Sequence, residues 1–451
     1  MRALVPAVGG ERQVPAPDPI ARDYLLLALR LDQHRPGLVD AFYGPADLKA
    51  QVDLEPLRPP ARLREDASGL WERVDLEIED LPRRRWLAAQ LMALEAQAGL
   101  LAGDPLPYED RVARSFGVRP ARRPEREFEL AAATIDGLLP GRGSVADRLA
   151  AWDAASGVPT ERLRPVAEAL VTRFRGRARA LFGLPGGESL RLELVRRQSW
   201  PGYAWYDGGY RSRIDLDMDS PIALDALIRT IAHRTYPGHH LERAWREADL
   251  VVGSGRLEAS VLLLETPEWL VGEALAELGV TFGSPPLEAA DLLVELYGLA
   301  GLPLEDDPTA ARERAARTVA MAPARAVLRA SAVNAALMRH VDGDEPGTVI
   351  AYLREAGRLT PDAAARRLAL IEHPLRLASA SVSTAGKDLL RRWLEMVPEG
   401  DRVARFARSL HETLTPASIE IEIEAAFETE IGEAMAGDQP AAHAASAAAI
   451  G

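Results

Sequence analysis

Apolar residues recur at the three- and four-residue spacing of an α-helix along most of this chain. The first such segment, IARDYLLLALRLDQH, spans residues 20–34, and a longer one rich in Ala, Leu and Gln spans residues 82–106. The longer segment closes on a Gly followed by Asp and Pro, which is typical of a helix end. The same spacing predicts helices at residues 145–157, 162–183, 223–233, 286–301, 310–340, 346–357 and 360–373.

Strand-like alternation is scarce. Its best examples are SLRLELVRR at 189–197 and GGYRSRIDLDM at 208–218, which alternate as the two strands of a half-buried hairpin would. The segment 419–435, IEIEIEAAFETEIGEAM, fits a strand by its alternation and a helix by its continuation, so both stay open. The sequence therefore predicts a mainly α-helical protein with a small β hairpin just before its histidine cluster.

Composition suggests where this helical chain divides. Residues 1–19 contain four prolines and two adjacent glycines without apolar periodicity, which predicts a loose leader. Residues 436–451 are rich in Ala and are expected to form a disordered tail. The Pro- and Arg-rich segment RPARRPERE interrupts the helical pattern and favours a boundary near residue 130, between a helical region at 20–130 and a second one at 131–435.

Charge and residue usage exclude several classes of function. A formal charge of −13 argues against broad binding to nucleic acid, which depends on Lys and Arg neutralising phosphates. No window approaches the roughly 18 unbroken apolar residues of a membrane span, and no signal peptide is visible, so we expect a cytoplasmic protein. The chain has no cysteine, so any metal must be held by His, Asp or Glu.

The segment HRTYPGHH, residues 233–240, holds three of the eight histidines in the chain. In zinc hydrolases with an HExxH helix, two histidines four residues apart bind the metal, but here Pro237 takes the second position. On one continuous helix His240 would share a face with His233, whereas a kink at Pro237 could present His239 instead. The spacing slightly favours His240, and it also fits a Pro-Gly turn with two surface histidines.

A carboxylate on a second helix is the usual third ligand of such a site. The segment ETPEWLVGEALAELG, residues 265–279, predicts a helix that begins near Glu268 and carries Glu273 and Glu277 one turn apart on the same face. Glu265 lies just before it. Each of these carboxylates could equally be a solvated surface group or a charge favoured by the helix dipole. A second HE pair, at His411 and Glu412, has no histidine after it and is interpreted as surface helix.

These segments resemble the domain of unknown function 885 family, whose members look like helical zinc metallopeptidases. The family pattern HExxPGHH is similar to HRTYPGHH, and its later EG-containing helix is similar to TPEWLVGEALAELG, with Ala274 at the glycine position. The resemblance extends over about residues 20–400. It also includes YLLLALRLDQHRPGLVDAFYGP, YAWYDGGYRSRIDLDMDSP, NAALMRH and IEHPLRLASASVSTAGKDLL.

The resemblance implies zinc held by His233, by one of His239 and His240, and by Glu273. It also implies a substrate cleft between helices, with Tyr210, Arg211 and Arg213 of the hairpin forming one wall. An Arg there could hold a peptide carboxylate by a bidentate contact, as a carboxypeptidase requires. The two arginines could equally be exposed strand charges.

The chain departs from the family pattern at two chemical positions. Arg234 replaces the Glu that would act as general base, and a guanidinium has no acceptor for a proton. Its charge would also repel a divalent metal unless Glu268 or Glu277 pairs with it, and either could stand in as the base. Near Ser383 and Thr384 the resemblance implies a tyrosine, which is absent.

Two functions follow from these residues. The first is a zinc-dependent hydrolase of peptides or small amides, carboxypeptidase-like, whose activity is weakened or lost through Arg234. The second is a non-catalytic descendant that uses the retained fold and cleft for binding or regulation. Imidazole and carboxylate ligands also accept transition metals other than zinc, and the sequence does not fix the oligomeric state.

Overall fold

A computed structural model describes residues 18–198, 200–219, 221–303, 307–374, 376 and 379–437. In this part the chain is mainly helical, as predicted, and the segment left open at 419–435 is helix. The helices are α1 (Pro19–His34), α2 (Ala46–Leu54), α3 (Pro60–Glu77), α4 (Leu81–Ala102), α5 (Tyr108–Phe116), α6 (Glu125–Leu138), α7 (Val145–Ala154), α8 (Thr160–Phe182), α9 (Leu224–Arg234), α10 (His239–Arg246), α11 (Pro267–Gly283), α12 (Pro286–Leu299), α13 (Pro308–Arg329), α14 (Ser331–Leu337), α15 (Pro346–Glu355), α16 (Pro361–Ile371), α17 (Ser379–Glu395), α18 (Arg402–His411) and α19 (Pro416–Gly437).

The strands form two small sheets, and one prediction about them is wrong. β1 (Val39–Phe42) pairs with β5 (Val261–Leu263), and the second sheet has the order β2-β4-β3. Both predicted strands exist, as β2 (Ser189–Val195) and β4 (Arg211–Asp217), but they run parallel. The hairpin is instead β3 (Gly202–Gly208) with β4, because the intervening GYAWYDG, which the pattern missed, is itself a strand.

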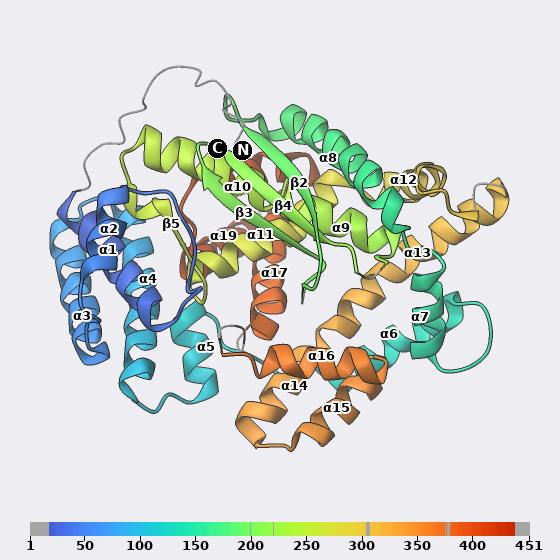
Figure 1. Cartoon of the computed structure of the whole chain (residues 1–451), viewed down its shortest axis with the longest axis horizontal. Coiled ribbons are helices and arrows are strands. Elements are labelled where there is room, and N and C mark those ends of the chain that lie inside the picture. Colours follow the sequence, from blue (N-terminus) through green and yellow to red (C-terminus); the bar gives the residue numbers. More distant parts are fainter. Residues whose placement is uncertain are drawn as a thin grey trace, which may run out of the picture.

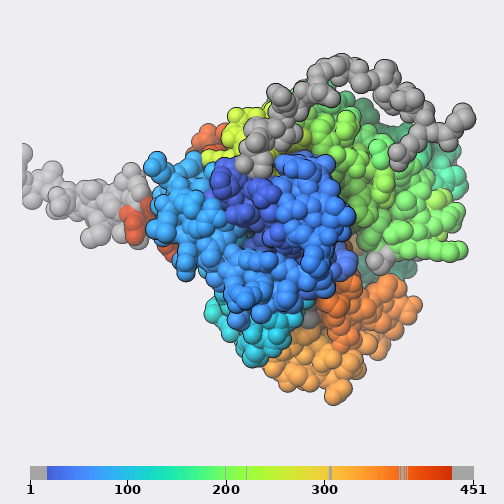
Figure 2. Space-filling view, turned by 60° about the vertical axis from the view of Figure 1, so that its left-hand side comes forward, coloured from blue at the N-terminus to red at the C-terminus, as the bar shows by residue number. Residues whose placement is uncertain are grey.

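Two large apolar cores hold these elements together. One joins α1, α3 and α4 to the segment around β5, with Tyr24 and Trp86 buried in contact between the helices. The other unites α8, α9 and α11 with the inner face of the three-stranded sheet, through residues such as Phe174 and Ile214. In Figure 1 the helices of the first core, α1, α3 and α4, lie at the blue end, and the three-stranded sheet lies beside α8, α9 and α10. Figure 2 shows the N-terminal surface in front of the green sheet region and the orange helices.

The predicted chain ends fall largely outside the described residues. Residues 1–17 of the loose leader and residues 438–451 of the tail are not among them. Asp18 is described, and its carboxylate accepts a hydrogen bond from the backbone N–H of Ala21 as the N-cap of α1. No described helix is long and apolar enough to cross a membrane. The boundary near residue 130 stays a prediction.

Candidate metal centre

The two histidine positions lie on two helices rather than on one. α9 ends at Arg234, and α10 begins at His239 after a four-residue turn that contains a cis Tyr236–Pro237 peptide bond. The N–H of Gly238 donates to the carbonyl of Ala232 at 3.2 Å and closes this turn tightly. The break lets His239, not His240, face His233, with ring centroids 4.8 Å apart, so the slight preference for His240 is not met.

α11 brings the carboxylate against this turn. Thr266 is its N-cap, whose hydroxyl accepts a hydrogen bond from the N–H of Trp269, and Pro267 at its first position suits a helix start. Gly279 and Gly283 face Pro237: a Cβ built on either would lie 3.3 Å from the proline ring. The missing side chains allow a close approach of α11, which places Glu273 opposite the two histidines.

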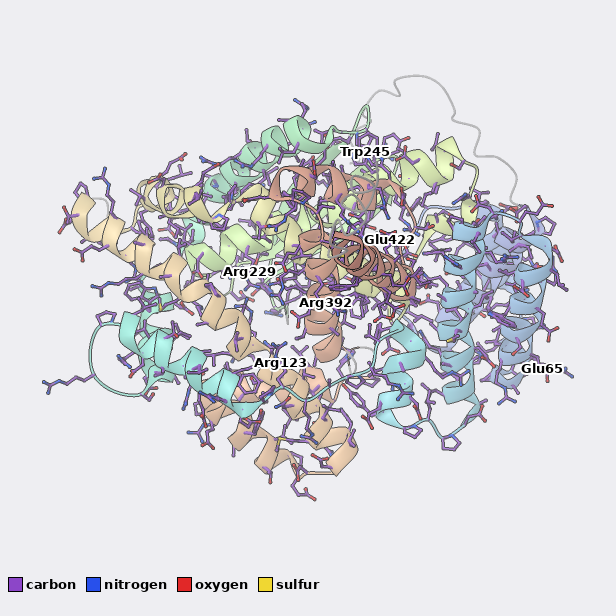
Figure 3. The ribbon with its side chains drawn as sticks, turned by 180° about the vertical axis from the view of Figure 1, so that it is seen from behind. Glu65, Arg123, Arg229, Trp245, Arg392 and Glu422 are labelled. Carbon is purple, nitrogen blue, oxygen red and sulfur yellow. The ribbon has the colours of Figure 1, made fainter. Side chains whose placement is uncertain are left out.

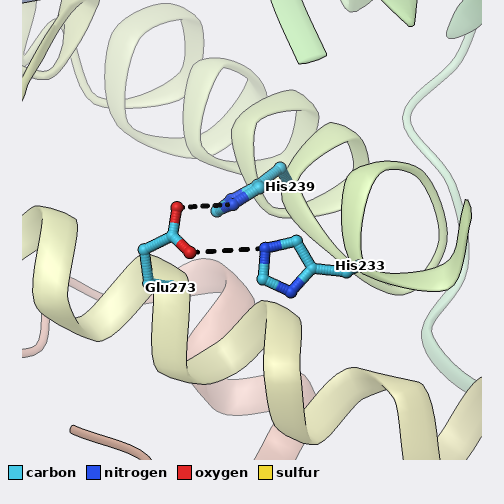
Figure 4. A group of neighbouring side chains, drawn as sticks. All are labelled: His233, His239 and Glu273. Carbon is cyan, nitrogen blue, oxygen red and sulfur yellow. Dashed lines mark hydrogen bonds and ion pairs between the residues drawn. The ribbon is translucent and has the colours of Figure 1, made fainter. Parts of the chain in front are cut away.

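His233, His239 and Glu273 form a compact group whose ligand atoms all lie within 4.8 Å of one another. Nε2 of His233 is 3.3 Å from one Glu273 oxygen, and Nε2 of His239 is 3.1 Å from the other, as Figure 4 shows. Tetrahedral bonds of about 2.0–2.1 Å to zinc imply ligand atoms about 3.3 Å apart. The two histidine–carboxylate separations are close to this value, so the three residues are candidate ligands of a zinc-sized ion.

The electrostatic state of the group also suits a cation. Burial lowers the pKa of His239 to about 3, so this ring is neutral at neutral pH. Burial acts to raise the pKa of Glu273, but His239 and His233 outweigh it and hold the pKa well below its ordinary value. A neutral imidazole and an ionised carboxylate are the forms that bind a metal ion.

Arg234 points toward the group rather than away from it. Its Nη1 lies 3.8 Å from the Oε1 of Glu273, and its guanidinium carbon lies 5.8 Å from the centre of the Tyr203 ring. The cation therefore shares the carboxylate that the two histidines contact. This geometry lowers the negative charge available to a metal ion, as the sequence led us to expect.

Glu277 lies behind His233. Its Oε1 is 3.5 Å from the Nδ1 of His233, the nitrogen that faces away from Glu273, and 3.9 Å from Arg229. Metal-binding histidines commonly direct their second nitrogen at a carboxylate, which fixes the orientation of the ring. Glu277 therefore lies beside the second nitrogen of His233 without a hydrogen bond to it, and the Arg that it pairs with is Arg229 rather than Arg234.

His240 belongs to a different, fully buried network. Its Nε2 lies 3.1 Å from Glu188 and its Nδ1 lies 2.8 Å from the hydroxyl of Ser212 on β4. Glu188 also accepts a hydrogen bond from Tyr236 and pairs with Arg175. The histidine thus links the start of α10 to the sheet, and its partners leave it no approach to Glu273.

The other predicted carboxylates serve as anchors. Glu268 pairs with Arg246 at 2.9 Å and accepts a hydrogen bond from Gln90 at 3.2 Å, so it is directed at α10 and α4 instead of the histidines. Glu265, with a φ of 55°, is buried and pairs with Arg35 and Arg111. Neither residue is brought into the group.

The hairpin residues predicted to bind substrate have structural contacts of their own. The backbone N–H of Tyr210, in the turn before β4, donates to Glu247 at 3.2 Å. Arg213 pairs with Asp215 at 2.9 Å and lies over the Trp205 ring, whereas Arg211 is exposed. The structure places Arg211 and Arg213 on β4 and Tyr210 in the turn before it. Their part in a cleft stays a prediction.

The remaining candidates lie elsewhere. His411 pairs with Asp249 and contacts the Trp245 ring, and Glu412 pairs with Arg408, so the second HE pair consists of ordinary surface contacts. The hydroxyl of Thr384 donates to the carbonyl of Ala380 within α17. The side chain of Ser383 lies outside the described residues.

Two carboxylates near the histidines escaped the sequence analysis. Glu188, the partner of His240, lies 52 positions earlier, and no local pattern connects the two. Glu242 follows His239 by three residues on the same helix face, a spacing that could have been noticed. Burial raises the pKa of Glu242, and this residue lines a crevice of about 20 Å³ beside His239.

Comparisons with known proteins give fold likenesses of low similarity. No protein-family model and no curated protein matches the chain. Among solved structures, it is similar to a "putative lipoprotein" from Colwellia psychrerythraea (12% identity, TM-score 0.47), covering 82% of this chain and 66% of that one. It is also similar to a "putative lipoprotein of unknown function" from Shewanella oneidensis (12% identity, TM-score 0.42), covering 80% and 71%. The chain thus spans less than two thirds of the first structure, and neither likeness bears on the chemistry of the group.

Replacing Gly238 by Ala tests the turn that separates the histidines. An added Cβ would lie 1.9 Å from the carbonyl oxygen of His233, so the backbone must move. We expect a loss of about 1–3 kcal/mol in unfolding free energy, measured by urea denaturation. The control is Gly176→Ala in α8, where a Cβ meets nothing within 4 Å and a gain of about 0.5–1 kcal/mol is expected. Equal stabilities of the two variants would contradict this account.

Glu268 should make stability fall as pH rises. Burial raises its pKa to about 7, so the folded protein favours the protonated carboxyl more than the unfolded chain does. The resulting contribution to stability is complete below about pH 4.5 and is lost as the pH rises through 7. Between pH 5 and 8 we expect the unfolding free energy of the wild type to fall by on the order of 1–3 kcal/mol through this group, and we expect Glu268→Gln to lack that fall. Denaturation at several pH values measures it, with the exposed Glu129→Gln as control. An unchanged pH slope in Glu268→Gln would refute the assignment.

Proposed function

We propose that this protein binds zinc through His233, His239 and Glu273, in a centre of the metallohydrolase type. The carrying observation is the mutual approach of three ligand atoms within 4.8 Å, from two helices and a third that crosses them. Three protein ligands with a further position left for solvent or substrate are typical of catalytic rather than structural zinc. The resemblance to the domain of unknown function 885 family, carried by HRTYPGHH, agrees with this proposal.

The proposed substrates are peptides or small amides, cleaved slowly. Bound zinc would supply a Lewis acid and lower the pKa of a water molecule. Of the chain's own residues, Glu277 would hold the orientation of His233, and Arg234 would offer hydrogen bonds to an anionic group of the substrate. Arg234 accepts no proton, so the general-base step lacks the residue that usually performs it. A cytoplasmic location belongs to this proposal.

A non-catalytic binding role is the second candidate. It is favoured by one observation: the guanidinium of Arg234 lies 3.8 Å from Glu273, where it pairs with a proposed ligand instead of serving turnover. In that case the metal would serve structure or ligand binding. The two candidates share the zinc site and differ in whether hydrolysis is measurable.

Elemental analysis of the untagged protein tests the zinc site. We expect about one zinc per chain in the wild type, because the two histidine–carboxylate separations are close to those of a tetrahedral site. His233→Ala, His239→Gln and Glu273→Gln should lose most of it. His240→Gln is the matched control and should retain it, since His240 contacts Glu188 instead. A wild type that takes up no zinc from excess metal, or equal losses in His239→Gln and His240→Gln, would reject the proposed ligands.

Arg234→Glu tests why turnover should be slow. The new carboxylate supplies a proton acceptor and removes a repelling cation, so we expect peptide hydrolysis to rise by about 10²–10⁴. Arg234→Gln is the control: it removes the charge without adding a base, so zinc affinity should rise while the rate does not. Both are measured with zinc-loaded protein and a dipeptide panel. Equal rates in the two variants would show that the missing base is not the limiting feature.

A further inference from the structure

A second site lies on the other side of Glu277, in a hollow with a cationic lobe and an apolar lobe. The cationic lobe has a volume of about 540 Å³ and the apolar lobe about 390 Å³, each within the usual size of a ligand pocket. The lobes adjoin, because they share part of their lining: Arg229, Glu277, Pro323, Ala326, Arg329 and Lys387.

The cationic lobe concentrates positive charge in a protein of net charge −13. Six of its thirteen lining residues are Arg or Lys, and two are acidic. The acidic pair is already engaged, since Asp388 contacts Arg123 and Arg391, and Glu277 contacts His233 and Arg229. Figure 3 labels Arg123 and Arg229, which lie beside α13. The lobe therefore holds more cations than its own carboxylates neutralise.

Three of these cations come from different helices and converge without an ion pair. Arg329 ends α13, Arg367 lies on α16 and Lys387 lies on α17, and none pairs with a carboxylate of the described residues. Desolvation lowers the pKa of Arg329 to about 10, and the neighbouring Arg229 adds to the shift. Such a cluster is repulsive when empty, and an anion that bound there would relieve the repulsion.

The apolar lobe gives the ligand a second property. Its wall includes Val280, Leu293, Val319 and Ala322, from α11, α12 and α13. These side chains offer contact to a short hydrocarbon body but no charge. The two Arg forks suit the paired oxygens of a carboxylate or phosphate, and Lys387 adds a point charge.

We propose that this hollow binds a small organic anion, with a carboxylate or phosphate head of two or more negative charges in the cationic lobe and an apolar body in the other lobe. The head pairs with Arg329, Arg367 and Lys387. The body lies against α11, α12 and α13. This site does not depend on a metal ion and is separate from the three-residue group.

Isothermal titration calorimetry in the presence of a chelator tests the proposal with defined probes. Hexyl phosphate or hexylsuccinate should bind, inorganic phosphate should bind about tenfold or more weakly because it lacks the apolar body, and hexylammonium should not bind. If only one of the two alkyl dianions binds, that result identifies the head group as phosphate or carboxylate. If neither alkyl dianion binds, or if hexylammonium binds equally well, the proposal is overturned. If hexyl phosphate and inorganic phosphate bind with equal affinity, the proposed contact of the apolar body with the apolar lobe is overturned.

Single-charge variants locate the binding. Arg367→Gln and Lys387→Gln, on separate helices, should each weaken hexyl phosphate about tenfold or more, since each removes a charge-assisted contact. Arg366→Gln, an exposed neighbour on the same helix that lies outside the hollow's lining, should leave the affinity unchanged. Equal affinities in all three variants would place the anion elsewhere. His233→Ala lacks a proposed zinc ligand and should still bind hexyl phosphate. That outcome shows that anion binding does not depend on the metal centre.

Discussion

The close approach of α11 to the turn between α9 and α10 is the constraint on which the candidate centre depends. Gly279 and Gly283 leave room for Pro237, and Gly238 leaves room for the carbonyl of His233. A Cβ at Gly238 would lie 1.9 Å from that carbonyl oxygen and would force the backbone to move, whereas a Cβ at Gly279 or Gly283 would lie 3.3 Å from the proline ring and require a smaller adjustment. Because interiors are close-packed, such movements act on the neighbouring contacts, which include those of Glu273 with the two histidines.

α10 shows how the same region is fixed by charge as well as by the apolar packing of Leu241. It lies in the interior, yet His240, Arg243 and Arg246 contact Glu188, Asp40 and Glu268, which come from distant parts of the chain. Breaking one such buried pair costs more than making it gains, since it leaves an uncompensated charge. These pairs therefore specify one position and rotation of α10. That rotation turns His239 toward Glu273.

The sequence predicts well what depends on local pattern. The long helices follow from apolar spacing, and the helix predicted to begin near Glu268 is α11, which begins one residue earlier, at Pro267. It predicts poorly what depends on distant contacts. The parallel pairing of β2 with β4 arises because β3 lies on the other side of β4. The choice of His239 over His240 depends on Glu188 and Ser212, whose positions no local pattern reveals. The sequence marks the carboxylates of 265–279 as candidates. Only the packing of α11 against the turn between α9 and α10 shows that Glu273 reaches the histidines and that Glu265 and Glu268 pair with arginines instead.

Glu277 shows how one side chain can serve two neighbouring environments. Burial acts to raise its pKa, but His233 and then Arg229 hold it below the ordinary value, so it is a carboxylate. Its charge faces the histidine on one side and the cationic lobe on the other. Asp388 is engaged by Arg123 and Arg391, so the single charge of Glu277 is left to balance Arg229, Arg329, Arg367 and Lys387. The cations of the hollow and His233 therefore share one carboxylate. The uneven balance follows from the fold, because α9, α13, α16 and α17 each contribute a cation to the hollow, whereas α11 contributes one carboxylate, Glu277, to the lining of its cationic lobe.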